Sequence, residues 1–228
     1  YAYITFMTVW IVACNLYLID YVKSNPKSNK NNKPGSTLLL VLSPINMIIL
    51  FVLSLVLLYK LISTQSDQTF RKHSILLLFL SVFSIFTVPL TERIQQKNPQ
   101  SLAQLTTTFF SIVISASIFA FSFPNMIKTW WIFALLIALI GIIIARITIS
   151  ILGYSKNSQE SQSLSTFSAI VFSVFIAYDT KIAAAAAKTC REGHADYIKY
   201  ATNIFLDFLN LFSNLEDLSK LKSNDNLL

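Results

Sequence analysis

Long apolar runs constrain the fold of this chain more than any other feature of its sequence. Six of them approach the roughly 20 residues that a helix needs to cross a bilayer, and a seventh is more polar but keeps helical periodicity. The sequence therefore predicts an all-α integral membrane protein, a single membrane domain over residues 1–228 in which seven transmembrane helices form one bundle. The predicted helices cover residues 2–21, 37–61, 74–90, 102–123, 129–152, 163–187 and 195–218.

The composition agrees with a membrane protein and excludes a nucleic-acid binder. Hydrophobic residues make up 54% of the 228 positions, charged residues make up 13%, and the mean hydropathy is +0.59, well to the apolar side of a soluble domain. The net charge of +7 comes mostly from loops between the runs, whereas a nucleic-acid binder gathers basic residues on a soluble module. The two cysteines, Cys14 and Cys190, give neither a disulfide framework nor metal-ligand spacing.

One of the apolar runs carries a carboxylate near its middle. Residues 171–188 read VFSVFIAYDTKIAAAAAK, with Asp179 inside the helical stretch. An ionised aspartate at bilayer depth is unfavourable unless it faces a cavity, shares a proton or finds a partner, so Asp179 is a candidate functional residue. Lys181 projects to another side of the helix and is expected to extend toward the interface, as is Arg146, for which pairing with an acid is the alternative.

The last predicted helix carries a polar stripe along one face. Its polar positions recur at spacings of three and four residues, which is the spacing of one helical face. Hydrocarbon offers no partner for an amide or a carboxylate, so this helix is predicted to lie inside the bundle, with Asp207 near its midpoint. The stripe consists of Tyr200, Asn203, Asp207, Asn210, Asn214 and Asp217.

Two consecutive helices thus each carry one intramembrane aspartate. A short connection makes these helices antiparallel neighbours, and Asp179 and Asp207 differ in depth by about one helical turn, so a modest tilt brings their carboxyl groups together. Two carboxylates about 4 Å apart repel by roughly 4 kcal/mol at an effective dielectric constant of about 20, and such a pair shares a proton. With that proton the pair holds the helices together; with both groups ionised it separates or recruits a cation. The alternative is that each aspartate only hydrogen-bonds an unrelated helix.

The same region resembles a known family. The segments AIVFSVFIAYDTK and ATNIFLDFLNLFSNL closely resemble the last two conserved segments of the transmembrane BAX inhibitor motif family, the Bax inhibitor-type proteins. The resemblance implies a seven-helix bundle with a central last helix, acting as a pH-sensitive calcium leak linked to apoptosis regulation in an organelle membrane (endoplasmic reticulum, Golgi or mitochondrial inner membrane). It places Asp179 and Asp207 at the paired aspartates of the family, and Tyr178 and Asn210 at neighbouring motif positions.

Calcium is then the transported ion, and no cofactor is expected. Calcium prefers six to eight oxygen ligands, so Asp179 and Asp207, with Asn203 or Asn210 and water, supply only a weak site. A leak needs weak binding, because a tight site would not release the ion. The same groups would also serve a proton path without calcium. The supporting polar residues are Tyr178, Asn203, Asn210 and Asn214.

Two other functions stay open at this point. The main alternative is a non-conducting structural or interaction subunit of a larger membrane complex, with membrane lipids and other proteins as partners. An intramembrane aspartyl protease is a remote alternative, because presenilin-type proteases require Gly-x-Gly-Asp at the second aspartate, where this chain reads IFLDFLN. His73 and His194 lie in predicted loops without paired ligands, and the sequence contains no phosphate loop or nucleophile elbow, so no enzyme is predicted.

Overall fold

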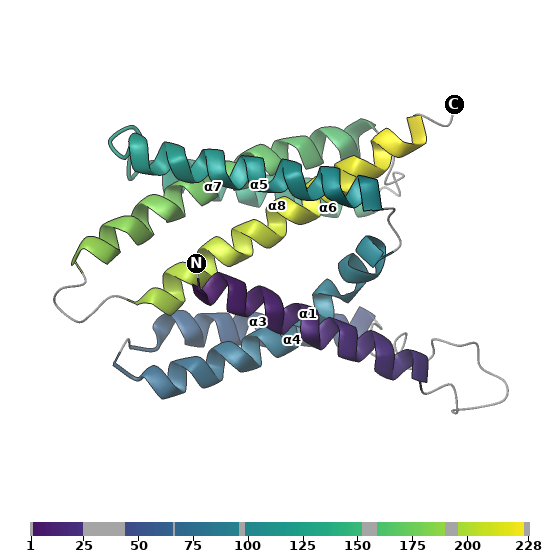
Figure 1. The fold of residues 1–228 in the computed structure, drawn as a ribbon, viewed down its shortest axis with the longest axis horizontal. Helices are drawn as coiled ribbons and strands as arrows, with labels where there is room; N and C mark the ends of the chain where they lie inside the picture. Colours follow the sequence, from purple (N-terminus) through teal and green to yellow (C-terminus); the bar gives the residue numbers. More distant parts are fainter. Residues whose placement is uncertain are drawn as a thin grey trace. The chain divides into compact units, whose positions relative to one another are not determined.

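A computed structural model describes residues 2–24, 44–65, 67–95, 99–151, 159–189 and 196–225. These residues form seven α-helices and no strand, which confirms the all-α prediction (Figure 1). Most of the polar loop before residue 37, the first residues of the second predicted helix, Cys190 and His194 lie outside the described residues. The helices are α1 (Ala2–Ser24), α3 (Pro44–Ser63), α4 (Thr69–Gln95), α5 (Pro99–Ser122), α6 (Trp131–Ile151), α7 (Gln159–Thr189) and α8 (Tyr197–Asp225).

Six helices extend beyond a predicted end. α1, α3 and α5 do so by two or three residues, and α4, α7 and α8 by more at one end at least. α4 begins at Thr69, after a turn in which the Thr69 amide donates to the Asp67 carbonyl at 2.9 Å, and it continues past Pro89 to Gln95. A proline inside a membrane helix is tolerated because neighbouring groups satisfy the freed carbonyl. α7 and α8 are longer than predicted because their ends are polar, and the apolar runs on which the prediction rested stop short of them.

Five of the described helices are long and apolar enough to cross a membrane: α1, α4, α5, α6 and α7. In α3 the described apolar stretch is shorter, Ile48–Ser63. α8 is not among these five helices, because its polar face lowers its average hydropathy. The structure therefore agrees with an integral membrane protein of the all-α class, and the crossing of all seven helices stays a prediction.

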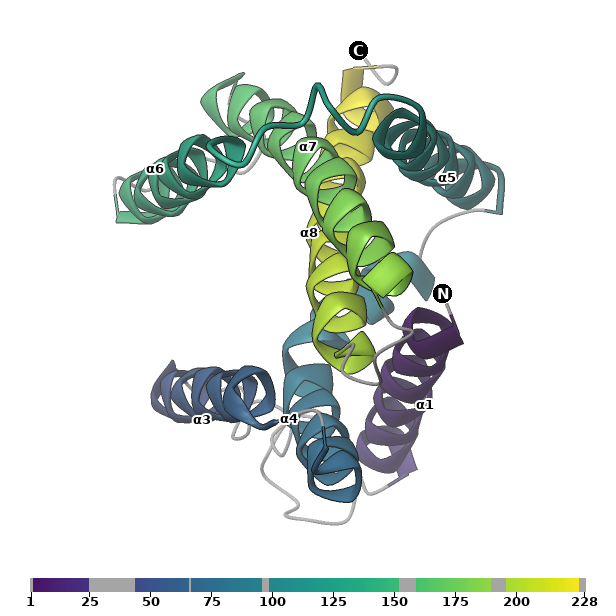
Figure 2. The same ribbon diagram turned by 90° about the vertical axis from the view of Figure 1, so that its left-hand side faces the viewer.

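The contacts divide the chain into two compact units, Tyr1–Gln96 and Lys97–Leu228. In the first unit, α4 packs against both α1 and α3. In the second, α7 packs against α5, α6 and α8, and α5 also contacts α8. Figure 2 shows α7 between α5 and α6. Within its own unit, α7 thus packs extensively against all three other helices. The single membrane domain and the central place of α8 in a whole bundle stay predictions.

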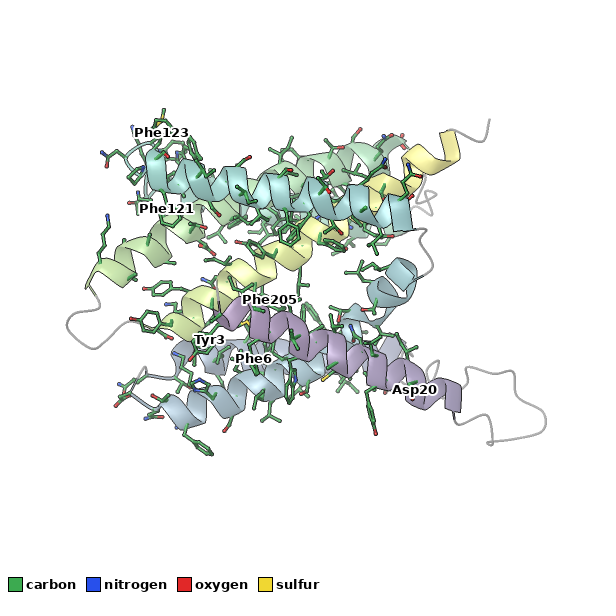
Figure 3. All side chains as sticks on the ribbon, viewed as in Figure 1. Tyr3, Phe6, Asp20, Phe121, Phe123 and Phe205 are labelled. Atoms are coloured by element: carbon green, nitrogen blue, oxygen red, sulfur yellow. The ribbon has the colours of Figure 1, made fainter. Side chains whose placement is uncertain are left out.

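Hydrogen bonds between side chains join α1 to α4. Near the first turn of α1 (Figure 3), the Tyr3 hydroxyl lies 3.1 Å from His73 Nε2, and farther along, Trp10 Nε1 donates to the Ser81 hydroxyl at 3.2 Å. The Asn15 side-chain amide donates to the hydroxyls of two threonines on α4, at 2.9 and 2.8 Å. Polar side chains between apolar helices act as glue, so these contacts fix the register of α1 on α4. The two threonines are Thr87 and Thr91.

The core of the second unit consists of apolar side chains from all four helices. Phe172, Phe175 and Ile176 of α7 are buried in it, as are residues of α5, α6 and α8. Phe109 of α5 meets two rings of α8 edge to face, with centroids 5.7 and 5.4 Å apart, a favourable geometry for aromatic pairs. The rings are Phe208 and Phe212. This packing positions α8 against α7 and thereby sets the relation between the two intramembrane aspartates.

The contact of Asn15 with α4 leads to a stability prediction. Asn15→Ala is expected to lower the free energy of unfolding by about 1 kcal/mol, because two hydrogen bonds between membrane helices are lost at about 0.6 kcal/mol each. Unfolding is measured by circular dichroism in mixed micelles. Ser74→Ala is the control, because the Ser74 hydroxyl bonds only the Phe70 carbonyl of its own helix. An equal effect of both substitutions would contradict this role of Asn15.

Candidate functional site

Asp179 lies on α7 and Asp207 on α8, and these two helices pack against each other. The charge of Asp179 acts on Asp207 across the contact of the two helices. Asp207 is only 8% exposed and Asp179 is half-buried. A hydrogen bond between two carboxyl groups needs a proton on one of them, because an ionised carboxylate only accepts. The structure thus places the two aspartates that the sequence singled out on neighbouring helices, and the sharing of a proton between them stays a prediction.

The surroundings of the pair are mainly apolar. Along the two helices, residues close in sequence to the aspartates are buried, among them Ile176 and Tyr178 on α7 and Phe205 on α8. Asp207 Oδ2 is buried and has no hydrogen-bond partner among the described residues. A carboxylate oxygen in such a place is poorly solvated, and leaving it unpaired is unfavourable. The site therefore favours whatever supplies positive charge to it, a proton or a cation.

The polar stripe of α8 is not uniformly buried. Asn214 is 4% exposed and Asn203 is half-buried, whereas Asn210 is exposed. Helical geometry explains the difference, since seven residues bring Asn214 back to within about 20° of Asp207, while three residues leave Asn210 about 60° away. The Asn210 amide donates to the Leu206 carbonyl of its own helix at 3.0 Å. Asn210 therefore lies at the edge of the buried face.

Two basic side chains of this unit bind polar groups of neighbouring segments. Arg146 of α6 donates from Nη2 to the Asn214 side-chain oxygen at 2.5 Å, rather than only extending to the interface as the sequence suggested. The Lys181 ammonium, on α7, donates to the main-chain carbonyl of Ile127, in the connection between α5 and α6. Lys181 thus extends to the helix ends, as expected for a lysine that leaves the hydrocarbon.

Other buried polar groups were not anticipated from the sequence. Glu216 is fully buried near the last turns of α8, and Thr202 is buried as well, with its hydroxyl on the Ile198 carbonyl at 2.7 Å. In the first unit, Lys72 is 1% exposed and donates to the Thr64 carbonyl at 2.8 Å. The only sequence signal for Glu216 was its place next to the stripe residue Asp217, and no spacing pattern marked Lys72.

The described residues hold no group of three or more histidine, cysteine, aspartate or glutamate side chains that could bind a metal ion. The oxygens close to the described site come from two carboxyl groups, fewer than the six to eight ligands that calcium takes. Water and amide oxygens would have to complete the coordination of any cation there. Such a site fits an ion in transit better than a resident metal.

The contact between the two aspartates predicts an energetic coupling. In a double-mutant cycle, Asp179→Asn and Asp207→Asn are expected to be non-additive by between about 0.5 and 3 kcal/mol, as for side chains in direct contact. Thermal unfolding in mild detergent measures each variant. Asp217→Asn, combined with Asp179→Asn, is the control, because Asp217 lies about 15 Å beyond Asp207 along α8 and should be additive. Additivity in both cycles would contradict the contact.

Comparison with known proteins agrees with this arrangement. A family model described as "Inhibitor of apoptosis-promoting Bax1" matches residues 1–226. No curated protein and no solved structure matches the chain. The family match covers nearly the whole chain and confirms the resemblance seen in the segments around Asp179 and Asp207. The chain therefore belongs to the Bax inhibitor-1 family, the transmembrane BAX inhibitor motif proteins.

Proposed function

We propose that this protein is a pH-sensitive calcium leak channel of the Bax inhibitor type, gated by Asp179 and Asp207. The observation that carries the proposal is the packing of α7 against α8, the two helices that bear these aspartates. Asp207 is buried there, and its Oδ2 has no hydrogen-bond partner among the described residues. Family membership supports the same function. The proposal extends to an organelle membrane as the location and to a part in the regulation of apoptosis.

The proposed gate works through the charge of the pair. One shared proton lets the carboxyl groups bond each other and holds α7 to α8. When that proton leaves, two charges about 4 Å apart repel by roughly 4 kcal/mol at an effective dielectric constant of about 20. The helices then move apart or a cation takes the place of the proton. Calcium neutralises both charges at once, which a monovalent ion cannot do.

The site is suited to passage rather than storage. Conduction requires an ion to bind well enough to enter and weakly enough to leave. Asp179 and Asp207 supply the charge, and the half-buried Asn203 is a further oxygen donor on the same helix face. Asn214 has its side-chain oxygen occupied by Arg146, so its role is to hold α6 against α8. We propose no enzymatic activity for this arrangement.

Calcium efflux from proteoliposomes tests the proposal. The native protein is expected to release calcium faster as the pH rises and the pair loses its shared proton. Asp179→Asn and Asp207→Asn are each expected to remove this pH dependence, because neither variant retains two titrating carboxyl groups. Asp67→Asn, in the exposed connection between α3 and α4, is the matched control and should behave as the native protein.

Absence of flux from the folded native protein would overturn the leak and favour a structural subunit in a larger membrane complex. A flux that keeps its pH dependence in both aspartate variants would retain the channel but contradict the gate. Circular dichroism of the reconstituted samples establishes that each variant is folded.

A further inference from the structure

A cavity of about 520 Å³ lies between α5, α6 and α7. Its volume falls in the range of small-molecule sites, about 300–1,000 Å³. One wall is formed by Ser111, Ser115 and Phe119 of α5, another by Ser173 and Ala177 of α7, and Trp131 of α6 closes one end. The Ser173 hydroxyl already donates to the Ala169 carbonyl at 2.7 Å. That bond occupies the Ser173 hydroxyl proton. Six of the nine lining residues are apolar, so the walls are suited to a hydrocarbon occupant.

The cavity has the length of one bilayer leaflet. Its lining on α5 extends from Ser111 to Phe119, eight residues, or about 12 Å along the helix axis. Half of the hydrocarbon core of a bilayer is about 15 Å. All three helices are candidate membrane spans. A lipid chain from one leaflet thus matches the cavity in length and polarity.

Two lysines stand at the end of the cavity closed by Trp131. Lys181 follows Ala177 by four residues on the same face of α7, and its ammonium lies against the connection between α5 and α6, bonded to the Ile127 carbonyl. Lys128 is the next residue of that connection and is exposed. Trp130 is exposed beside it, and tryptophan marks the headgroup level of membranes. Positive charge therefore meets the cavity at the depth of lipid phosphates.

Exposed aromatic rings surround the same end. Phe121 and Phe123, at and just beyond the end of α5, are 59% and 53% exposed (Figure 3). The cavity is apolar, is about as deep as one leaflet, and has basic and aromatic residues at one end. These features complement a lipid with a negatively charged headgroup.

We propose that the cavity between α5, α6 and α7 binds one acyl chain of an anionic phospholipid, whose phosphate is held by Lys128 and Lys181. This site is independent of the ion leak.

Fluorescence quenching of Trp131 tests the site in the full chain. Trp10→Phe with Trp130→Phe leaves Trp131 as the single tryptophan. The protein is reconstituted into vesicles of phosphatidylcholine containing a fixed fraction of either brominated phosphatidylglycerol or brominated phosphatidylcholine. Each lysine is expected to favour the anionic lipid by about five-fold in relative association constant. Lys128→Gln and Lys181→Gln should each reduce the preference by that factor, and Lys181→Arg should restore it.

A second variant tests the cavity itself. Ser115→Phe fills the space with a ring and is expected to reduce quenching by the anionic lipid to the level of the zwitterionic one. Ile114→Phe is the matched control, because Ile114 is 55% exposed, lies outside the lining and should leave quenching unchanged. Equal quenching by both lipids in the native protein would overturn the proposal. A preference for the anionic lipid that survives both lysine substitutions, or that survives Ser115→Phe, would overturn it as well.

Discussion

A carboxyl group buried between membrane helices must find a proton, a cation or a partner, and this requirement governs the contact between α7 and α8. In the proposed gate, Asp179 and Asp207 meet this requirement by sharing one proton, which joins the two helices. The rest of the second unit supports that contact. Phe109 of α5 packs on the rings of α8, and Arg146 of α6 bonds the Asn214 side chain. These contacts with α5 and α6 thereby hold α8 in position within the second unit.

Much of the fold followed from the sequence because apolar length and helical periodicity are local signals. They predicted all seven described helices, and the spacing within the last two placed Asp179 and Asp207 on facing helices. The helix ends were less predictable, because polar turns rather than apolar residues decide where α4, α7 and α8 begin or end. Contacts such as Arg146 with Asn214, 68 residues apart, depend on tertiary packing that no local pattern encodes. The burial of Glu216 has the same origin.

The two units use different means to join apolar helices. In the first, α1 and α4 are held by neutral hydrogen bonds that do not depend on an added ion, such as those of Asn15. In the second, the proposed contact of Asp179 with Asp207 depends on a proton. The cavity between α5, α6 and α7 adds a third kind of contact, the proposed one with a phospholipid. Its walls are apolar, and two lysines lie at one end.

Isotope-edited infrared difference spectroscopy of aspartate carboxyl groups, in the reconstituted protein, tests the central claim most directly, because it detects the shared proton itself. The account predicts one protonated carboxyl signal per chain near neutral pH that is lost in both Asp179→Asn and Asp207→Asn. A spectrum in which the signal is absent from the native protein, or persists unchanged in either variant, would contradict a proton shared between α7 and α8.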